Sequence, residues 1–222
     1  MRETSGLQEI RLYVYQQFAE TGTAPDTHQI AQNFNMTLEA TKEIIQELAD
    51  SRHIAIDKDH KILMAHPFSS VPLGFAVMGE KTIWWGGCSW DSFAVPNLLS
   101  QEVVVSTTCP NCLTAHAWRV DPQTPPEGNQ VAHFLMPVKQ MWTDVIHTCG
   151  NQRIFCNEEC LDSWLVQSQN QKGYVMNLAT LWNLASHWYE GRMSLDYKRR
   201  EPETAAQYFR EAGLSGSFWG LD

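Results

Sequence analysis

The sequence predicts an α+β fold in two parts: a winged-helix-like module over residues 1–65, then a mixed or antiparallel β-sheet domain with helices over residues 66–222. Three observations lead to this prediction. The chain of 222 residues is longer than one compact domain usually needs and shorter than two full-sized domains. The first part reads as helices and a hairpin, whereas the second alternates short strands with short helices. Two cysteine pairs in the second part have the spacing of a treble-clef-like metal site.

Apolar spacing and capping residues define the predicted elements of the first part. Gly22 ends a first helix whose apolar residues recur at helical spacing. Asp26 and Thr37 stand where the N-caps of the next two helices are expected. The predicted elements are helices over residues 6–21, 26–33 and 37–51, and a hairpin of strands 54–56 and 62–64.

The charge of the third helix argues against DNA binding. In a winged helix-turn-helix this helix enters the major groove, where phosphate contacts supply much of the affinity. Residues 37–51 carry four acidic side chains against one lysine, and the whole chain has 25 acidic against 16 basic residues, a net charge of −9. We therefore expect a packing or dimerising module and no nucleic-acid partner.

A connecting segment over residues 66–75, which contains two prolines, leads into the second part. Apolar side chains are ample for a core there, since the chain is 43% hydrophobic with 9 Trp. The first helix of this part is expected to end before Pro96. We expect strands at 75–78, 82–85, 103–106, 115–120 and 131–137, helices at 88–95 and 160–169, a loop at 121–130, and a helix, or a strand leading into one, at 178–189.

No segment of the sequence reads as a membrane anchor. No stretch approaches the ~18 consecutive apolar residues of a membrane span, and residues 1–15 lack the apolar core of a secretory signal. We therefore expect a cytoplasmic protein with no membrane partner. In a reducing compartment, clustered thiols indicate metal binding or catalysis rather than disulfides, so the six cysteines become the main functional signal.

Four of the cysteines have the spacing of a zinc site. Cys109 and Cys112 are separated by two residues, as in a zinc knuckle. Cys156 and Cys160 follow downstream, at the expected start of a helix. Together they predict a tetrahedral zinc site of the treble-clef kind, which we call the cysteine quartet; the alternative is four free thiols that share this spacing by chance.

The other two cysteines lie outside the quartet. Cys88 precedes Asp91 by three residues at a helix start, so a thiol and a carboxylate are expected on one helix face. Such a pair offers a soft nucleophile or metal ligand beside a proton donor, or else a buried cysteine beside a capping carboxylate. Cys149 is followed by Gly150, which predicts a turn with an exposed thiol.

The residues around Cys88 resemble the catalytic segment of organomercurial (alkylmercury) lyases, in which an aromatic-containing strand leads to Cys-x-x-Asp and an apolar helix ended by proline. The resemblance extends over residues 7–221. His66 to Ser69 is similar to a connection in that family, and Cys149, followed by Ile154-Phe155 and Trp164, maps onto its second catalytic cysteine. The segment that carries the resemblance is Trp85-Gly86-Gly87-Cys88-Ser89-Trp90-Asp91-Ser92-Phe93-Ala94-Val95-Pro96.

The resemblance implies protonolysis of a carbon-mercury bond to a hydrocarbon and Hg(II). Cys88 and Cys149 would bind the organomercurial substrate, since mercury prefers sulfur ligands, and Asp91 would deliver the proton. The reaction needs no cofactor, and Hg(II) would leave to small thiols or to a mercuric reductase. Well-known family members lack the full quartet, so a structural zinc is an addition here. Cys156 is the alternative second catalytic thiol, but choosing Cys149 divides the six cysteines into four and two.

Two further hypotheses remain from the residues themselves. The winged-helix-like module and the quartet together suit a zinc-binding, metal-sensing or regulatory protein. Alternatively, Cys88 is the nucleophile of an enzyme acting on another electrophile, with a histidine as base. The candidate bases have no diagnostic spacing and are His116, His133 and His147.

Overall fold

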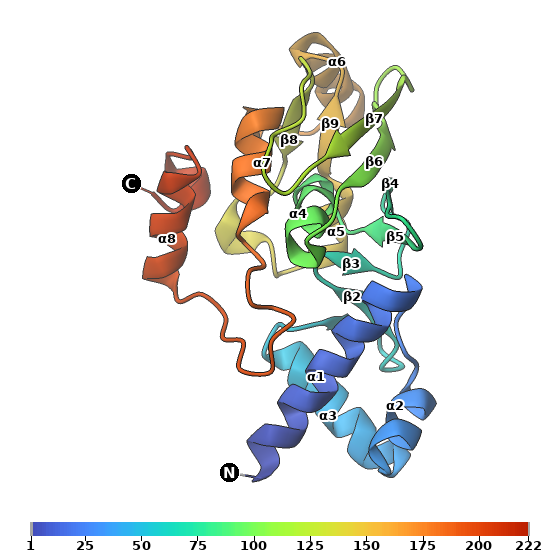
Figure 1. The fold of residues 1–222 in the computed structure, drawn as a ribbon. Coiled ribbons are helices and arrows are strands. Elements are labelled where there is room, and N and C mark those ends of the chain that lie inside the picture. Colours follow the sequence, from blue (N-terminus) through green and yellow to red (C-terminus); the bar gives the residue numbers. More distant parts are fainter. Residues whose placement is uncertain (1, 222) are drawn as a thin grey trace.

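The computed structural model describes residues 2–221, and its first part contains the three expected helices (Figure 1). Asp26 caps the second helix in a full capping box with Gln29. Thr37 caps the third by accepting a hydrogen bond from the Ala40 N–H. The winged-helix-like character of residues 1–65 and the domain boundary that follows stay predictions. The helices are α1 (Arg2–Thr21), α2 (Thr27–Phe34) and α3 (Leu38–Asp50).

A seven-stranded antiparallel sheet begins with the predicted hairpin and continues into the second part. Strand β2 pairs with β1 on one side and with β3 on the other, where Met64 lies opposite Ser69. The segment 66–75 is therefore not simply a connection, because it contains β3. The strands, in the order β1-β2-β3-β5-β4-β6-β7, are β1 (Ala55–Ile56), β2 (Ile62–Ala65), β3 (Phe68–Ser69), β4 (Phe75–Met78), β5 (Ile83–Gly86), β6 (Val103–Thr108) and β7 (Ala115–Val120).

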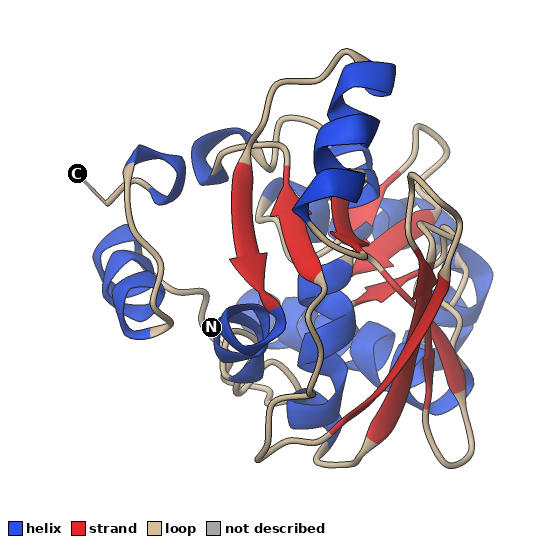
Figure 2. Cartoon of the chain, turned by 90° about the horizontal axis from the view of Figure 1, so that it is seen from above, coloured by secondary structure: helices blue, strands red, loops and turns tan. Residues whose placement is uncertain are grey.

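A second, three-stranded antiparallel sheet has the order β10-β8-β9. Its strands are β8 (Val131–Phe134), β9 (Gln152–Phe155) and β10 (Tyr174–Asn177), and they stand apart from the larger sheet in Figure 2. The strand expected at 131–137 ends early at Phe134, and β9 has no counterpart among the expected elements. Arg153 of β9 joins the two sheets, since its Nη1 donates a hydrogen bond of 2.7 Å to the Leu73 carbonyl just before β4.

Helix α4 (Ser89–Leu99) is buried along most of its length and packs against α7 (Leu178–Ser186). The expected end before Pro96 is wrong, because the helix continues through Pro96 and stops at the left-handed Ser100. Proline removes one intrahelical N–H donor, and the burial of neighbours such as Phe93 and Val95 offsets that loss.

The remaining helices are short. They are α5 (Val145–Gly150), α6 (Glu158–Ser168), α8 (Pro202–Glu211) and the 3₁₀ helices η1 (Val138–Gln140) and η2 (Ser217–Trp219). Helices α5 and α6 pack against β9 of the second sheet. Helix α8 lies to one side of the molecule in Figure 1. It is anchored by aromatic contacts, with Phe209 5.0 Å from Trp219 and 5.1 Å from Trp188 between ring centroids. None of the helices within residues 2–221 has the length and apolar character needed to cross a bilayer.

Candidate active site and cysteine quartet

Cys88 and Asp91 meet at the start of α4. Cys88 is the N-cap residue, and its Sγ accepts the Asp91 backbone N–H at 3.5 Å. The thiol in turn donates to Asp91 Oδ2 at 3.3 Å. Both side chains are almost fully buried, with 2% and 1% exposed. The predicted pairing of thiol and carboxylate on one helix face is therefore present. Asp91 is the third residue after the N-cap, which is the position that the alternative interpretation gives to a capping carboxylate.

Two glycines let the preceding strand approach this helix turn. A Cβ on Gly87 would lie 2.2 Å from Asp91 Oδ2 and 2.4 Å from Met64 Cε. A Cβ on Gly86 would lie 2.0 Å from Ser92 Oγ. Because real side chains do not come this close, a larger residue at Gly87 would displace the Asp91 carboxylate or Met64, and one at Gly86 would displace Ser92.

Cys149 faces the same carboxylate from α5. Its Sγ lies 3.8 Å from Asp91 Oδ2 and 3.8 Å from His66 Nε2. The expectation of an exposed thiol in a turn is wrong: Cys149 lies within a helix and is 4% exposed. Gly150 is the last helical residue and does not have a positive φ, so it does not open a turn at this point. One oxygen of Asp91 therefore lies within 4 Å of both sulfurs.

The pKa values of the two thiols shift in opposite directions. Burial, the hydrogen bond to Cys149 and the Asp91 carboxylate hold the pKa of Cys88 well above its usual range. The pKa of Cys149 is lowered, because the hydrogen bond from Cys88 and the neighbouring His66 outweigh burial. Burial disfavours charged His66, but Asp91 and Cys149 together raise its pKa. These shifts favour a Cys149 thiolate beside a Cys88 thiol.

A further group of residues supports this arrangement and was missed in the sequence. Tyr189 donates a hydrogen bond of 2.5 Å to Asp91 Oδ1. Arg192 lies over the Tyr189 ring, 4.7 Å from its centroid, and its Nη1 donates to the His66 carbonyl at 3.1 Å. Of these residues, only His66 was indicated by the sequence, through the family resemblance of the segment from His66 to Ser69. Tyr189 and Arg192 belong to no recognised motif.

A cavity of about 240 Å³ opens onto both thiols and Asp91. Asp91 is the only acidic residue among the described residues that line it. Its walls are largely apolar and aromatic, which suits a small hydrocarbon group. They include Trp90, Val138, Met141, Trp142, Val145, Trp188 and Phe209. The three candidate base histidines are absent from the described lining, and His66 is the histidine beside the thiols. The three are His116, His133 and His147.

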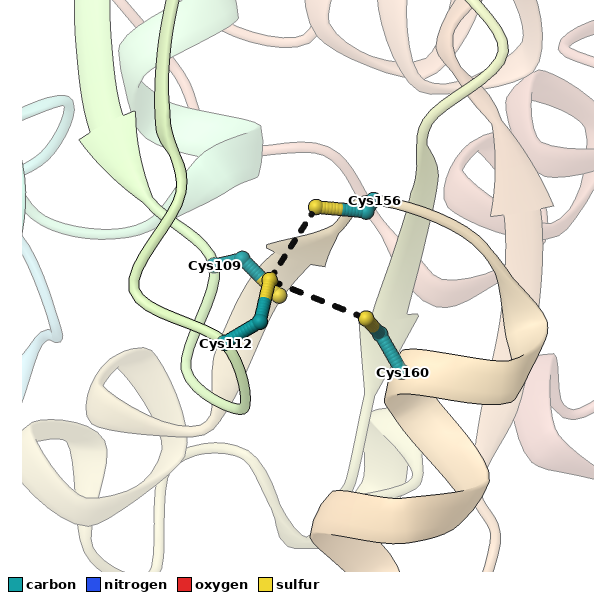
Figure 3. Close-up of side chains that lie close together, drawn as sticks. All are labelled: Cys109, Cys112, Cys156 and Cys160. Atoms are coloured by element: carbon teal, nitrogen blue, oxygen red, sulfur yellow. Dashed lines mark hydrogen bonds between the residues drawn. The ribbon is translucent and has the colours of Figure 1, made fainter.

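The cysteine quartet lies together in space, as its spacing predicts (Figure 3). All four sulfurs are within 4.8 Å of one another. Cys112 Sγ is 3.4 Å from Cys156 Sγ and 3.7 Å from Cys160 Sγ. Cys109 and Cys112 stand in the turn between β6 and β7, whereas Cys156 follows β9 and Cys160 lies in the first turn of α6. A tetrahedral zinc with Zn–S bonds of ~2.3 Å requires sulfur separations of ~3.8 Å, so this thiol set has the size for such an ion.

The surroundings of the quartet favour a thiolate at Cys112 and disfavour one at Cys156. Cys112 is exposed, and the Thr114 hydroxyl and backbone, followed by the other thiols, lower its pKa to about 6. Burial and the neighbouring thiols raise the pKa of Cys156 to about 12. His116 Nε2 lies 3.5 Å from Cys156 Sγ, so this candidate base contacts the quartet. Beneath the quartet, Cys109 packs in a small apolar cluster with Phe155, Leu161 and Leu165.

Comparisons with known proteins give a family and a fold. A family model described as alkylmercury lyase matches residues 68–190, more than half of the chain and including all six cysteines and Asp91. Ten chains of solved structures are similar. One, described as the crystal structure of the mercury-bound form of MerB2, has a TM-score of 0.62 at 14% identity and covers 87% of this chain and 100% of its own. This structural match shows a shared α+β fold and, at 14% identity, no more than the fold. No curated protein matches the chain.

Proposed function

The chain belongs to the alkylmercury lyase family and is an organomercurial lyase; we propose that Cys88, Asp91 and Cys149 carry out the cleavage. The supporting observation is the position of Asp91 Oδ2, within 3.3 Å of one sulfur and 3.8 Å of the other, in a cavity where it is the only acidic side chain among the described lining residues. Two thiols suit a soft metal. A buried carboxyl group between them is placed to pass protons.

The proposed reaction starts at Cys149. Its thiolate attacks the mercury of the substrate and displaces the small thiolate or other anion bound there. Cys88 then gives its proton to Asp91 Oδ2 as its sulfur binds the same mercury. The two sulfur ligands weaken the carbon-mercury bond. Its electron pair takes the proton from Asp91, the hydrocarbon leaves, and Hg(II) stays on the two thiolates with Asp91 ionised again.

Release of Hg(II) completes the proposed cycle. Small thiols or a mercuric reductase would take the ion from the two cysteines by ligand exchange, since thiolates compete directly for mercury. The reaction itself needs no cofactor, because the metal belongs to the substrate. A cytoplasmic location, where free thiols stay reduced, fits this exchange and is part of the proposal.

Hydrocarbon release from phenylmercury in excess neutral thiol tests the assignment. We expect benzene from the wild type and no detectable turnover from Cys149→Ser, with Cys156→Ser retaining turnover if the protein folds. The wild type should keep Hg(II) bound after a single turnover, whereas Cys149→Ser should bind the organomercurial more weakly. If Cys149→Ser is active and a folded Cys156→Ser is inactive, Cys156 is the second catalytic thiol and the assignment is wrong.

We also propose that the cysteine quartet holds a structural zinc ion. Its sulfur separations of 3.4 and 3.7 Å approach those of a tetrahedral zinc-thiolate site. The ion would tie the β6–β7 turn of the large sheet to β9, which directly follows the α5 helix that carries Cys149. A zinc ion here would fix the position of Cys149 relative to Cys88 without entering the reaction.

Metal analysis tests the quartet separately from the active site. We expect about one zinc per chain in the purified protein, about the same in Cys88→Ser, and a loss of zinc together with a lower melting temperature in Cys160→Ser. Zinc loss in Cys88→Ser would contradict the division of the six cysteines. The alternative metal-sensing function is not favoured, because the family match spans both the thiol pair and Asp91.

A further inference from the structure

Four arginines line the cavity above the two thiols, in a chain whose net charge is −9. Arg52 follows α3, whereas Arg192, Arg199 and Arg200 belong to the segment between α7 and α8. Together they make up a quarter of the chain's 16 basic residues. The acids closest to them in sequence are outside the described lining; they are Asp50, Glu190, Asp196 and Glu201. We call the four arginine side chains the arginine rim.

The rim is held in place without being neutralised. Arg199 Nη1 donates to the Ser51 carbonyl at 3.1 Å, and its guanidinium lies 5.3 Å from the centroid of the Trp142 ring. Arg200 Nη2 donates to the His187 carbonyl at 2.7 Å and lies 4.6 Å from the Tyr208 ring centroid. Carbonyls and aromatic faces orient guanidinium groups but carry no compensating charge.

No carboxylate in the described chain forms an ion pair with the rim. The ion pairs found within residues 2–221 involve other cations. The Nε atoms of Arg192 and Arg200 are buried and have no hydrogen-bond partner among those residues. Burial, followed by the neighbouring Arg192, lowers the pKa of Arg199. Uncompensated guanidinium charge beside a cavity is a feature of an anion site, because guanidinium groups bind carboxylates through paired donors.

Resting on the proposed function, we propose that the arginine rim binds a carboxylate of the incoming mercury compound, carried either by its organic group or by the small thiol bound to its mercury. Asp91 does not fill this role, because Tyr189 and the two thiols already occupy its oxygens. The apolar walls take the hydrocarbon part, and the rim holds the acidic end at the cavity mouth. The enzyme thus favours anionic mercurials or anionic thiol adducts over neutral ones.

Matched substrate pairs test this preference and identify the source of the carboxylate. The first pair is 4-carboxyphenylmercury and 4-carbamoylphenylmercury, both supplied with 2-mercaptoethanol. The second is phenylmercury supplied with mercaptoacetate or with mercaptoacetamide. We expect kcat/KM to favour the acid of at least one pair by about tenfold, the usual scale of one charge-assisted hydrogen bond. The pair that shows the preference identifies whether the organic group or the thiol carries the carboxylate.

Arginine variants tie the preference to the rim. Arg199→Gln and Arg200→Gln should reduce the acid-to-amide ratio toward one, and Arg200→Lys should keep part of it. Arg119→Gln is the matched control, because it changes the net charge by the same amount. Arg119 is exposed and paired with Glu102. The ratio of this variant should equal that of the wild type. Melting temperature and far-UV circular dichroism establish that each variant is folded.

The wild-type ratios decide the proposal whether or not the variants fold. Equal kcat/KM values within both pairs would overturn it, as would an equal fall of the ratio in Arg119→Gln. Absence of hydrocarbon from all four combinations would instead reject the proposed function. A preference that disappears in the folded Arg199→Gln and Arg200→Gln variants, but not in Arg119→Gln, would establish the arginine rim as a carboxylate site.

Discussion

The hydroxyl of Tyr189 donates a 2.5 Å hydrogen bond to Asp91 Oδ1, joining the segment after α7 to the first turn of α4. This bond leaves Oδ2 as the oxygen that faces both sulfurs. The two oxygens of one carboxylate thus have separate tasks: one fixes the side chain and the other is placed for proton transfer. Because both groups are almost fully buried, removal of the hydroxyl would leave Asp91 Oδ1 without this donor.

Tyr189→Phe should therefore slow the reaction without removing mercury binding. A hydrogen bond to a charged group contributes ~1.5–3 kcal/mol, so kcat should fall by about 10- to 100-fold. The pH dependence of kcat/KM should move as well, since Tyr189 acts through Asp91. Tyr13→Phe, at a ring that contacts Phe34 far from the cavity, is the control and should leave both unchanged. An unchanged pH profile in Tyr189→Phe would mean that Tyr189 has only a packing role.

Asp91→Asn should abolish proton delivery while keeping the shape of the site. Loss of a general acid commonly costs ~10²- to 10⁴-fold in rate. The variant should still bind the organomercurial through Cys88 and Cys149 and retain the carbon-mercury bond. Mass spectrometry of the protein would then detect the intact organomercury adduct. Rapid hydrocarbon release from this variant would show that the proton comes from another group.

Gly87→Ala should inactivate the enzyme by displacing the Asp91 carboxylate. The added methyl group would lie 2.2 Å from Asp91 Oδ2 and 2.4 Å from Met64 Cε, so one or both must move. Gly150→Ala is the matched control: it adjoins Cys149, yet its added Cβ meets nothing within 4 Å. We expect turnover to fall at least about tenfold, the effect of losing one oriented group, in Gly87→Ala only. Equal activity of the two variants would argue against this close approach.

The sequence predicts those parts of the site that are local in the chain. Cys88 and Asp91 are three residues apart on one helix turn, so helical geometry alone brings them together. The quartet is likewise built from two short motifs. Cys149 was assigned by family resemblance, and its burial was not foreseen because α5 is only six residues long. Tyr189 reaches Asp91 from 98 residues away, a contact that depends on the packing of α7 against α4.

The errors in the predicted fold have similar causes. Strand β3 is two residues long, which is too short for a periodic pattern in the sequence. It is defined by pairing with neighbours on both sides, Met64 of β2 and Gly86 of β5. Helix α4 continues past Pro96 because tertiary burial outweighs a local preference. Strands with clear alternation or apolar runs were placed within a few residues, as in β7, where the predicted and observed bounds coincide at Ala115–Val120.

His133 should make the folded state sensitive to acid. Its Nε2 accepts the Gly173 backbone N–H at 2.9 Å, which requires the neutral ring. Burial, followed by nearby Lys172, lowers the pKa of His133 to about 4, from 6.5 in the unfolded chain. The unfolded state therefore binds the proton more readily, and this contribution to stability is complete above pH 6.5 and is lost as the pH falls toward about 4.

Urea denaturation at about pH 7 and about pH 5 measures this effect through the change in the free energy of unfolding. His133→Gln keeps an acceptor for Gly173 but cannot take up a proton, so its free energy of unfolding should change less between the two pH values than that of the wild type. His147→Gln, at an exposed position on α5, should behave like the wild type. A wild-type dependence that persists in His133→Gln would place the responsible proton on another group.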